Sequence, residues 1–240
     1  MPTTAGMSIA PATVTDTEVN PSALLRLFHL VSPALPVGAY AYSQGLEYAV
    51  HAGWVRDEAS TLDWLAGLAR RGLGTLDLPI LLRLYDAWIA ADPVRVRAWT
   101  AQLIASRETA ELRAEELHLG QALARVLPEL GVEEAGRWRE AMPAYATMFS
   151  LAAAHWGVSP CATLLGYLWA WSENQVIAAL KLVPLGQSAG VRILHQLTAS
   201  MPAIVEHALK LSDQRIGVSV VSQAFASALH ESQYSRLFRS

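Results

Sequence analysis

Histidine, cysteine and carboxylate side chains are the residues of this sequence that could bind a metal ion or take part in catalysis. Glu115 and His118 form its one E-x-x-H motif, a spacing used in di-iron helix bundles. Such a site needs a second motif and two further carboxylates, and none of the seven histidines forms an H-x-x-x-H or H-E-x-x-H pair. We therefore interpret Glu115 and His118 as an exposed polar helix face. We predict no metal site, no catalytic residue and no cofactor.

Neither the single cysteine nor a search for nucleotide-binding motifs indicates a catalytic site. Cys161 lies beside Pro160 in an apolar stretch without a nearby basic residue, so we expect a buried, unreactive thiol. The phosphate-binding patterns G-x-x-x-x-G-K-[ST] and G-x-G-x-x-G do not occur, and neither does the G-x-S-x-G nucleophile elbow. The sequence therefore offers no evident catalytic site.

Residues 32–47 are the first of three segments whose residue types and order are more unusual than the packing of a helical core requires. They read SPALPVGAYAYSQGLE, a loop with prolines, glycines and tyrosines that runs into a helix which Ser43 can cap. The tyrosines either pack on the core or form a contact surface, since ordered aromatic loops commonly bind partners. The candidate partner-binding residues here are Tyr40, Tyr42, Ser43 and Glu47.

Residues 178–187 and 234–240 are the other two segments. Lys181 falls in the last turn of an expected helix, where its charge opposes the helix dipole, and this role alone can explain it. The segment YSRLFRS places two apolar residues between two arginines; such tails often fray, but Tyr, Phe and Arg also anchor interfaces. Its candidate partner-binding residues are Tyr234, Arg236, Leu237 and Phe238.

The elements that must position these segments are helices. Apolar residues recur at helical spacing over most of the chain, and only residues 218–221 look β-prone. Asp92 before Pro93 and Ser159 before Pro160 predict capped helix starts, and Ser60 with Asp63 resembles a capping box. Helix ends are indicated at Gly53, Gly157 and Pro184 with Gly186. A clear apolar face is formed by Leu78, Leu81, Leu82, Tyr85, Trp88 and Ile89. We predict an all-α, single-domain helical bundle of roughly nine or ten helices.

Composition limits the protein class and its location. The 240 residues are 52% hydrophobic and 16% charged with a net charge of −3, which argues against disorder and gives no general attraction to nucleic acid or anionic lipid. One cysteine forms no internal disulfide, so a cytoplasmic location is expected. The uncharged stretch from Ala144 to Ser172 is broken by Gly157 and Pro160, which favours two buried helices over a membrane span.

We divide the chain into three parts. Residues 1–21 are small and polar and are expected to be a disordered N-terminal tail, residues 22–230 the helical domain, and residues 231–240 a partner-binding C-terminal tail. In the free protein, we expect residues 234–240 to be mobile and to become ordered on a partner. Few charges and eight tryptophans also predict an exposed apolar helical face, and hence a homodimer formed by helices in the second half of the chain.

The three segments, in this order, resemble the UreF family of urease accessory proteins. The similar motifs are S-P-A-L-P-V-G-x-Y-x-Y-S-Q-G-L-E, K-x-V-P-L-G-Q and S-R-L-F-R-S, together with R-E-T-x-E-L-R at residues 107–113. The resemblance extends from about Leu24 to Ser240. It implies a non-enzymatic helical dimer that binds the accessory protein UreH or UreD, recruits or regulates the GTPase UreG, and helps to load nickel into apo-urease. It also implies that the C-terminal tail binds UreH, and any GTP or nickel chemistry then belongs to a partner.

Two other hypotheses remain open at this point. The first is a helical enzyme with a buried polar site around Glu173, Asn174 and His155, and the second is a helical adaptor of unrelated biology. An enzyme should have a deep pocket in which ionisable residues with shifted pKa values converge, whereas a scaffold should have exposed apolar patches and a mobile tail.

Overall fold

The computed structural model describes residues 20–240, and no β-strand occurs among them, which confirms the all-α prediction. The expected tail over residues 1–21 lies outside the described residues as far as residue 19, whereas Asn20 already caps the first helix and Pro21 begins it. The described part of the chain has eleven α-helices and five short 3-10 or π segments. The α-helices are α1 (Pro21–Leu30), α2 (Leu46–His51), α3 (Glu58–Leu68), α4 (Asp77–Ile89), α5 (Pro93–Ala105), α6 (Ala110–Val126), α7 (Glu134–Arg137), α8 (Tyr145–His155), α9 (Pro160–Leu182), α10 (Gln187–Lys210) and α11 (Val221–His230).

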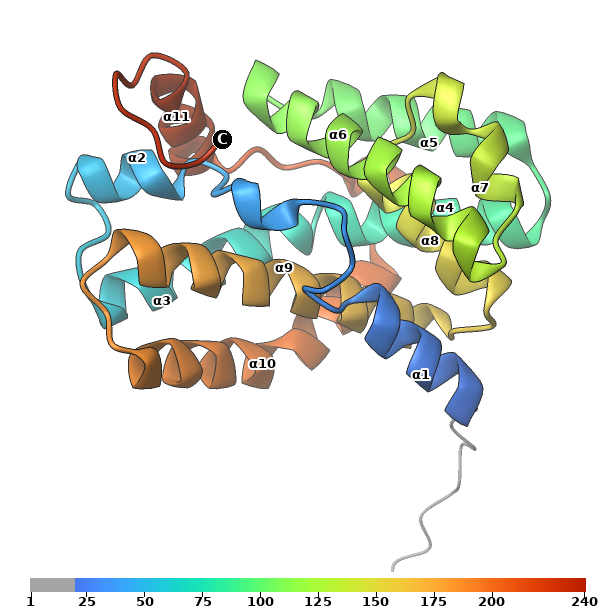
Figure 1. Ribbon diagram of the computed structural model, residues 1–240, viewed down its shortest axis with the longest axis horizontal. Coiled ribbons are helices and arrows are strands. Elements are labelled where there is room, and N and C mark those ends of the chain that lie inside the picture. Colours follow the sequence, from blue (N-terminus) through green and yellow to red (C-terminus); the bar gives the residue numbers. More distant parts are fainter. Residues whose placement is uncertain (1–19) are drawn as a thin grey trace, which may run out of the picture.

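Helix α4 lies at the centre of the bundle. It packs against α5, α8, α9 and α10, and α9 and α10 form a long hairpin along one side (Figure 1). Its expected apolar face is buried at Leu78, Leu81 and Tyr85, whereas Ile89 at the end of the helix is exposed. Burying such side chains is worth roughly 1.5–3 kcal/mol each, so this face holds the bundle together.

Side-chain caps define several helix starts. Asp92 caps α5 and Ser159 caps α9, each followed by a proline at the first helical position, as predicted. The capping box of α3 was placed wrongly, because it pairs Asp57 with Ser60 and not Ser60 with Asp63. Since α3 begins at Glu58, Ser60 occupies the third helical position and its partner precedes it.

The uncharged stretch from 144 to 172 forms helix α8 and the first half of α9, with a left-handed turn at Gly157 between them, as expected. Within the described residues, no helix combines the length and apolar character needed to cross a membrane. The expected burial of Cys161 is wrong, because this residue is exposed in the first turn of α9.

Helices α2 and α11 approach each other closely at Gly45. Gly45, at the start of α2, has a φ of 83°, and a Cβ atom there would lie 2.9 Å from the backbone nitrogen of Ser227 in α11. Only glycine tolerates both the conformation and the contact. The β-prone residues before α11 form no strand; residues 216–220 have no regular secondary structure, and α11 begins at Val221.

Candidate functional site

Residues 231–240 fold back from α11 onto α2 and the end of α9. The chain end lies beside α11 in Figure 1. The Phe238 side chain is 6% exposed and belongs to a small apolar cluster with Leu46, Ala49 and Val183. The expectation that this tail is mobile in the free protein is therefore wrong, because the chain itself supplies the pocket for Phe238.

Glu47 holds the backbone of this tail. Its two carboxylate oxygens accept hydrogen bonds from the backbone N–H groups of Leu237 and Phe238, at 2.7 and 2.8 Å. The backbone N–H and the hydroxyl of Ser43 both donate to the carbonyl oxygen of Ser240. Hydrogen bonds to a charged acceptor are about twice as strong as neutral ones, so Glu47 is the main anchor. The Ser43 hydroxyl also accepts from the N–H of Glu47, although the N-cap residue of α2 is Gly45.

A buried histidine links the tail to α6. His230 is fully buried, its Nδ1 lies 2.7 Å from a Glu111 oxygen, and its Nε2 lies 3.3 Å from a Glu47 oxygen. The second Glu111 oxygen lies 2.8 Å from a guanidinium nitrogen of Arg236. These contacts join α2, α6, α11 and the tail into one polar cluster.

The three sequence segments therefore meet in space. Lys181, exposed at the end of α9, places its Nζ 5.5 Å from the centroid of the Phe238 ring, within cation–π range. The candidate residues divide into two groups by exposure. Tyr42, Ser43, Glu47 and Phe238 are buried, whereas Tyr40, Lys181, Tyr234, Arg236 and Leu237 are exposed.

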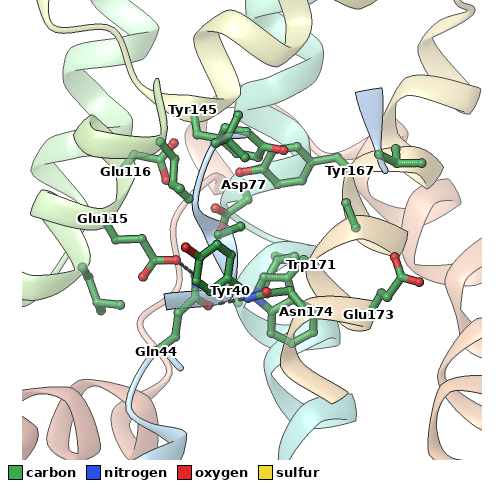
Figure 2. A pocket seen from close by; sticks show the side chains of 18 of the residues that line it. Tyr40, Gln44, Asp77, Glu115, Glu116, Tyr145, Tyr167, Trp171, Glu173 and Asn174 are labelled. Carbon is green, nitrogen blue, oxygen red and sulfur yellow. Dashed lines mark hydrogen bonds between the residues drawn. The ribbon is translucent and has the colours of Figure 1, made fainter. Parts of the chain in front are cut away.

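A cavity of about 120 Å³ lies on the other side of residues 32–47, between α4, α6, α8 and α9 (Figure 2). Glu115 lines it and accepts hydrogen bonds from the Gln44 amide at 2.8 Å and the Ser240 hydroxyl at 3.0 Å. Burial raises the pKa of Glu115 to about 7, against the lowering effect of these two hydrogen bonds. Gln44 also accepts from the indole N–H of Trp171, so one side chain connects α6 with α9.

A largely buried ion-pair network also lines the cavity. Arg107 pairs with both Asp77 and Glu116, and Glu116 also accepts the backbone N–H of Ala146 at 3.1 Å, which caps α8. Burial disfavours the charge on Arg107, but the two carboxylates outweigh it and hold the pKa of the guanidinium above its usual value. Burial, aided by Glu116, raises the pKa of the neighbouring Tyr145 hydroxyl.

Helix α6 supplies the residues that the sequence analysis missed. Glu115 was expected on an exposed face but is 6% exposed, and Glu116 is equally buried. The spacing of Leu112, Leu119 and Leu123, all buried, already places both glutamates on the apolar face of a helix. His118 is exposed, as expected.

The residues of the enzyme hypothesis do not converge. Glu173 and Asn174 line the cavity, but His155 is exposed at the end of α8 and does not line it. Among residues 20–240, no three His, Cys, Asp or Glu side chains are grouped so that they could hold a metal ion. The cavity does contain ionisable groups with shifted pKa values, which was the feature expected of an enzyme. The tail is ordered, whereas a mobile tail was expected of a scaffold. The cavity and the tail alone therefore do not distinguish a scaffold from an enzyme.

Comparison with known proteins identifies the family. The UreF family model matches residues 55–198. A urease accessory protein UreF from Alkalilimnicola ehrlichii is 48% identical over 226 residues, covering 93% of this chain and 99% of the relative. Proteins of the same name from Hahella chejuensis and Teredinibacter turnerae are 46% and 48% identical, over 92% and 90% of this chain.

The chain therefore belongs to the UreF family of urease accessory proteins. These relatives are named as accessory proteins and not as enzymes, which removes support from the enzyme hypothesis and from an unrelated adaptor.

Proposed function

We propose that this protein is the scaffold of a nickel-insertion complex for urease. In this proposal it binds UreH or UreD, recruits or regulates the GTPase UreG, and so promotes the maturation of apo-urease in the cytoplasm. It acts as a homodimer, and nucleotide and nickel chemistry belong to the partners.

Family membership over nearly the whole chain carries this proposal, and the exposed side of the ordered tail supports it. Tyr234 is fully exposed and Leu237 is 65% exposed, although their neighbours hold the backbone of the tail in place. An apolar side chain on an ordered backbone binds a partner at a lower entropic cost than one on a mobile segment. The tail is thus a preformed docking element for UreH or UreD.

The test is co-purification of the tagged full-length protein with UreH or UreD and with UreG. A double variant, Tyr234→Ala with Leu237→Ala, should lose UreH or UreD while its melting temperature stays near that of the wild type. Val191→Ala removes a similarly exposed apolar side chain from α10 and serves as the matched control. Unchanged capture of UreH or UreD by the double variant would contradict the docking role of the tail.

Lys181 offers a second test, because it covers Phe238 from the outside. An exposed cation–π contact is worth about 0.5–1 kcal/mol, so Lys181→Ala should fold almost normally. If Lys181 acts on a partner, this variant should still reduce urease activation in cells or the response of UreG. Wild-type activation by the folded variant would restrict Lys181 to its structural contact.

A further inference from the structure

A second hollow lies outside the cavity of Figure 2, at the junction of the tail with α6. It is an open groove of about 350 Å³, and its walls come from the loop before α2, the exposed side of α6 and the tail. The polar side chains that line it are Tyr42, His118, Gln121, Arg125 and Arg239. No Asp or Glu lines the groove, although α6 carries three glutamates.

Each carboxylate of α6 is bound elsewhere. Glu111 contacts His230 and Arg236, Glu115 contacts Gln44 and Ser240, and Glu116 contacts Arg107. Helix α6 therefore directs its three carboxylates to these partners, and none of them lines the groove. The face that carries positions 118, 121 and 125 is left with basic and neutral groups, because residues three and four apart share a helix face.

The groove presents hydrogen-bond donors without acceptors of opposite charge. Arg125 and Arg239 are exposed, and within residues 20–240 neither guanidinium makes an ion pair or a side-chain hydrogen bond. The Tyr42 hydroxyl lies 3.2 Å from Nδ1 of His118. When this hydroxyl donates to Nδ1, the imidazole carries its proton on Nε2 and offers a further donor.

We propose that this groove binds a small multivalent oxyanion such as phosphate, pyrophosphate or a tricarboxylate. Guanidinium groups bind phosphate and carboxylate oxygens through paired N–H donors, and two arginines line this groove together with a histidine and a glutamine. Because Arg125 belongs to α6 and Arg239 to the tail, a bound anion bridges the two elements and favours the docked tail. This inference does not depend on the proposed scaffold function.

The test is titration of the full-length protein with phosphate, pyrophosphate and citrate, each at matched ionic strength, by calorimetry and thermal unfolding. We expect saturable binding of at least one anion and a rise in melting temperature that follows its occupancy. Comparing the three anions separates phosphate chemistry from carboxylate chemistry. Absence of saturable binding for all three would overturn the proposal.

Variants locate the site. Arg125→Gln and Arg239→Gln should each weaken binding at least tenfold, and because both side chains are exposed the variants should keep the helical content of the wild type. Arg95→Gln, an exposed arginine on α5 outside the groove, should bind as the wild type does. Binding that is unaffected by both groove variants, or equally weakened by Arg95→Gln, would place the anion elsewhere and overturn the proposal.

Discussion

The Glu47 carboxylate holds the tail in the structure, whereas the sequence predicts Glu47 only as a partner-binding residue of segment 32–47. Its carboxylate accepts two consecutive backbone N–H groups at 2.7 and 2.8 Å and lies beside the buried ring of His230. A buried donor left without an acceptor costs about 1–3 kcal/mol. In this structure Glu47 therefore binds the chain's own tail.

Glu115 should make stability depend on pH. Its pKa is about 7 in the folded protein and near 4.5 when unfolded, so the folded state binds more protons between these values. The free energy of unfolding then falls as pH rises through this window, by roughly 3 kcal/mol for this group. Glu115→Gln cannot ionise, so its stability relative to wild type should rise between pH 5 and pH 8, as measured by urea denaturation.

Glu129→Gln is the matched control for this measurement, because Glu129 is exposed and lies outside the cavity. Its stability relative to wild type should change little between the two pH values. A stability difference for Glu115→Gln that is the same at pH 5 and pH 8 would contradict the raised pKa.

At the scale of the element, the tail is part of the folded core. Phe238 is buried in an apolar cluster with residues of α2, whereas its neighbour Leu237 is exposed. Phe238→Ala should therefore lower the free energy of unfolding by about 3–5 kcal/mol, and Leu237→Ala should change it by no more than about 0.5 kcal/mol. Denaturant unfolding of the two variants gives this comparison directly.

Deletion of residues 234–240 extends the same prediction. It removes the Phe238 ring and leaves the Glu47 carboxylate without its two backbone donors, so the melting temperature should fall markedly. A truncated protein that melts with the wild type would show that the tail contributes nothing to the fold.

At the scale of the whole molecule, helix α11 carries a stripe of exposed apolar side chains. Val221, Phe225 and Leu229 lie on one face of α11 and are 63%, 60% and 40% exposed. Contiguous exposed apolar side chains commonly mark an interface, and a two-fold axis is the most frequent way to cover one. The homodimer that the sequence predicts should therefore use this stripe.

The dimer prediction can be tested by light scattering at micromolar concentrations. Wild type should have the mass of a dimer and Phe225→Glu that of a monomer, because a charge in a covered apolar interface is costly. Ile89→Glu changes an equally exposed residue of α4 and should leave the dimer intact. A monomeric wild type would contradict the prediction.

The helices could be predicted from the sequence because their causes are local. Hydrogen bonds four residues apart, the caps at Asp92 and Ser159 and the apolar period of α4 all act within a few turns. The three segments at residues 32–47, 178–187 and 234–240 could also be found in the sequence, because they contain residue types that helix packing alone does not require. Family membership then agreed with their resemblance to UreF.

The burial of individual site residues depends on contacts between segments that are far apart in the sequence. Glu47 meets the tail across 190 residues of chain, and Glu115 meets Ser240 across 125. No local pattern shows whether a carboxylate will face water or will be buried against residues that are far away in the sequence. The pKa of Glu115 is raised by such burial, so it could not be predicted from the sequence. Local patterns therefore specify the helices and mark the three segments, whereas long-range packing orders the tail, because Phe238 packs on residues of α2 and α9 and Ser240 hydrogen-bonds to α6.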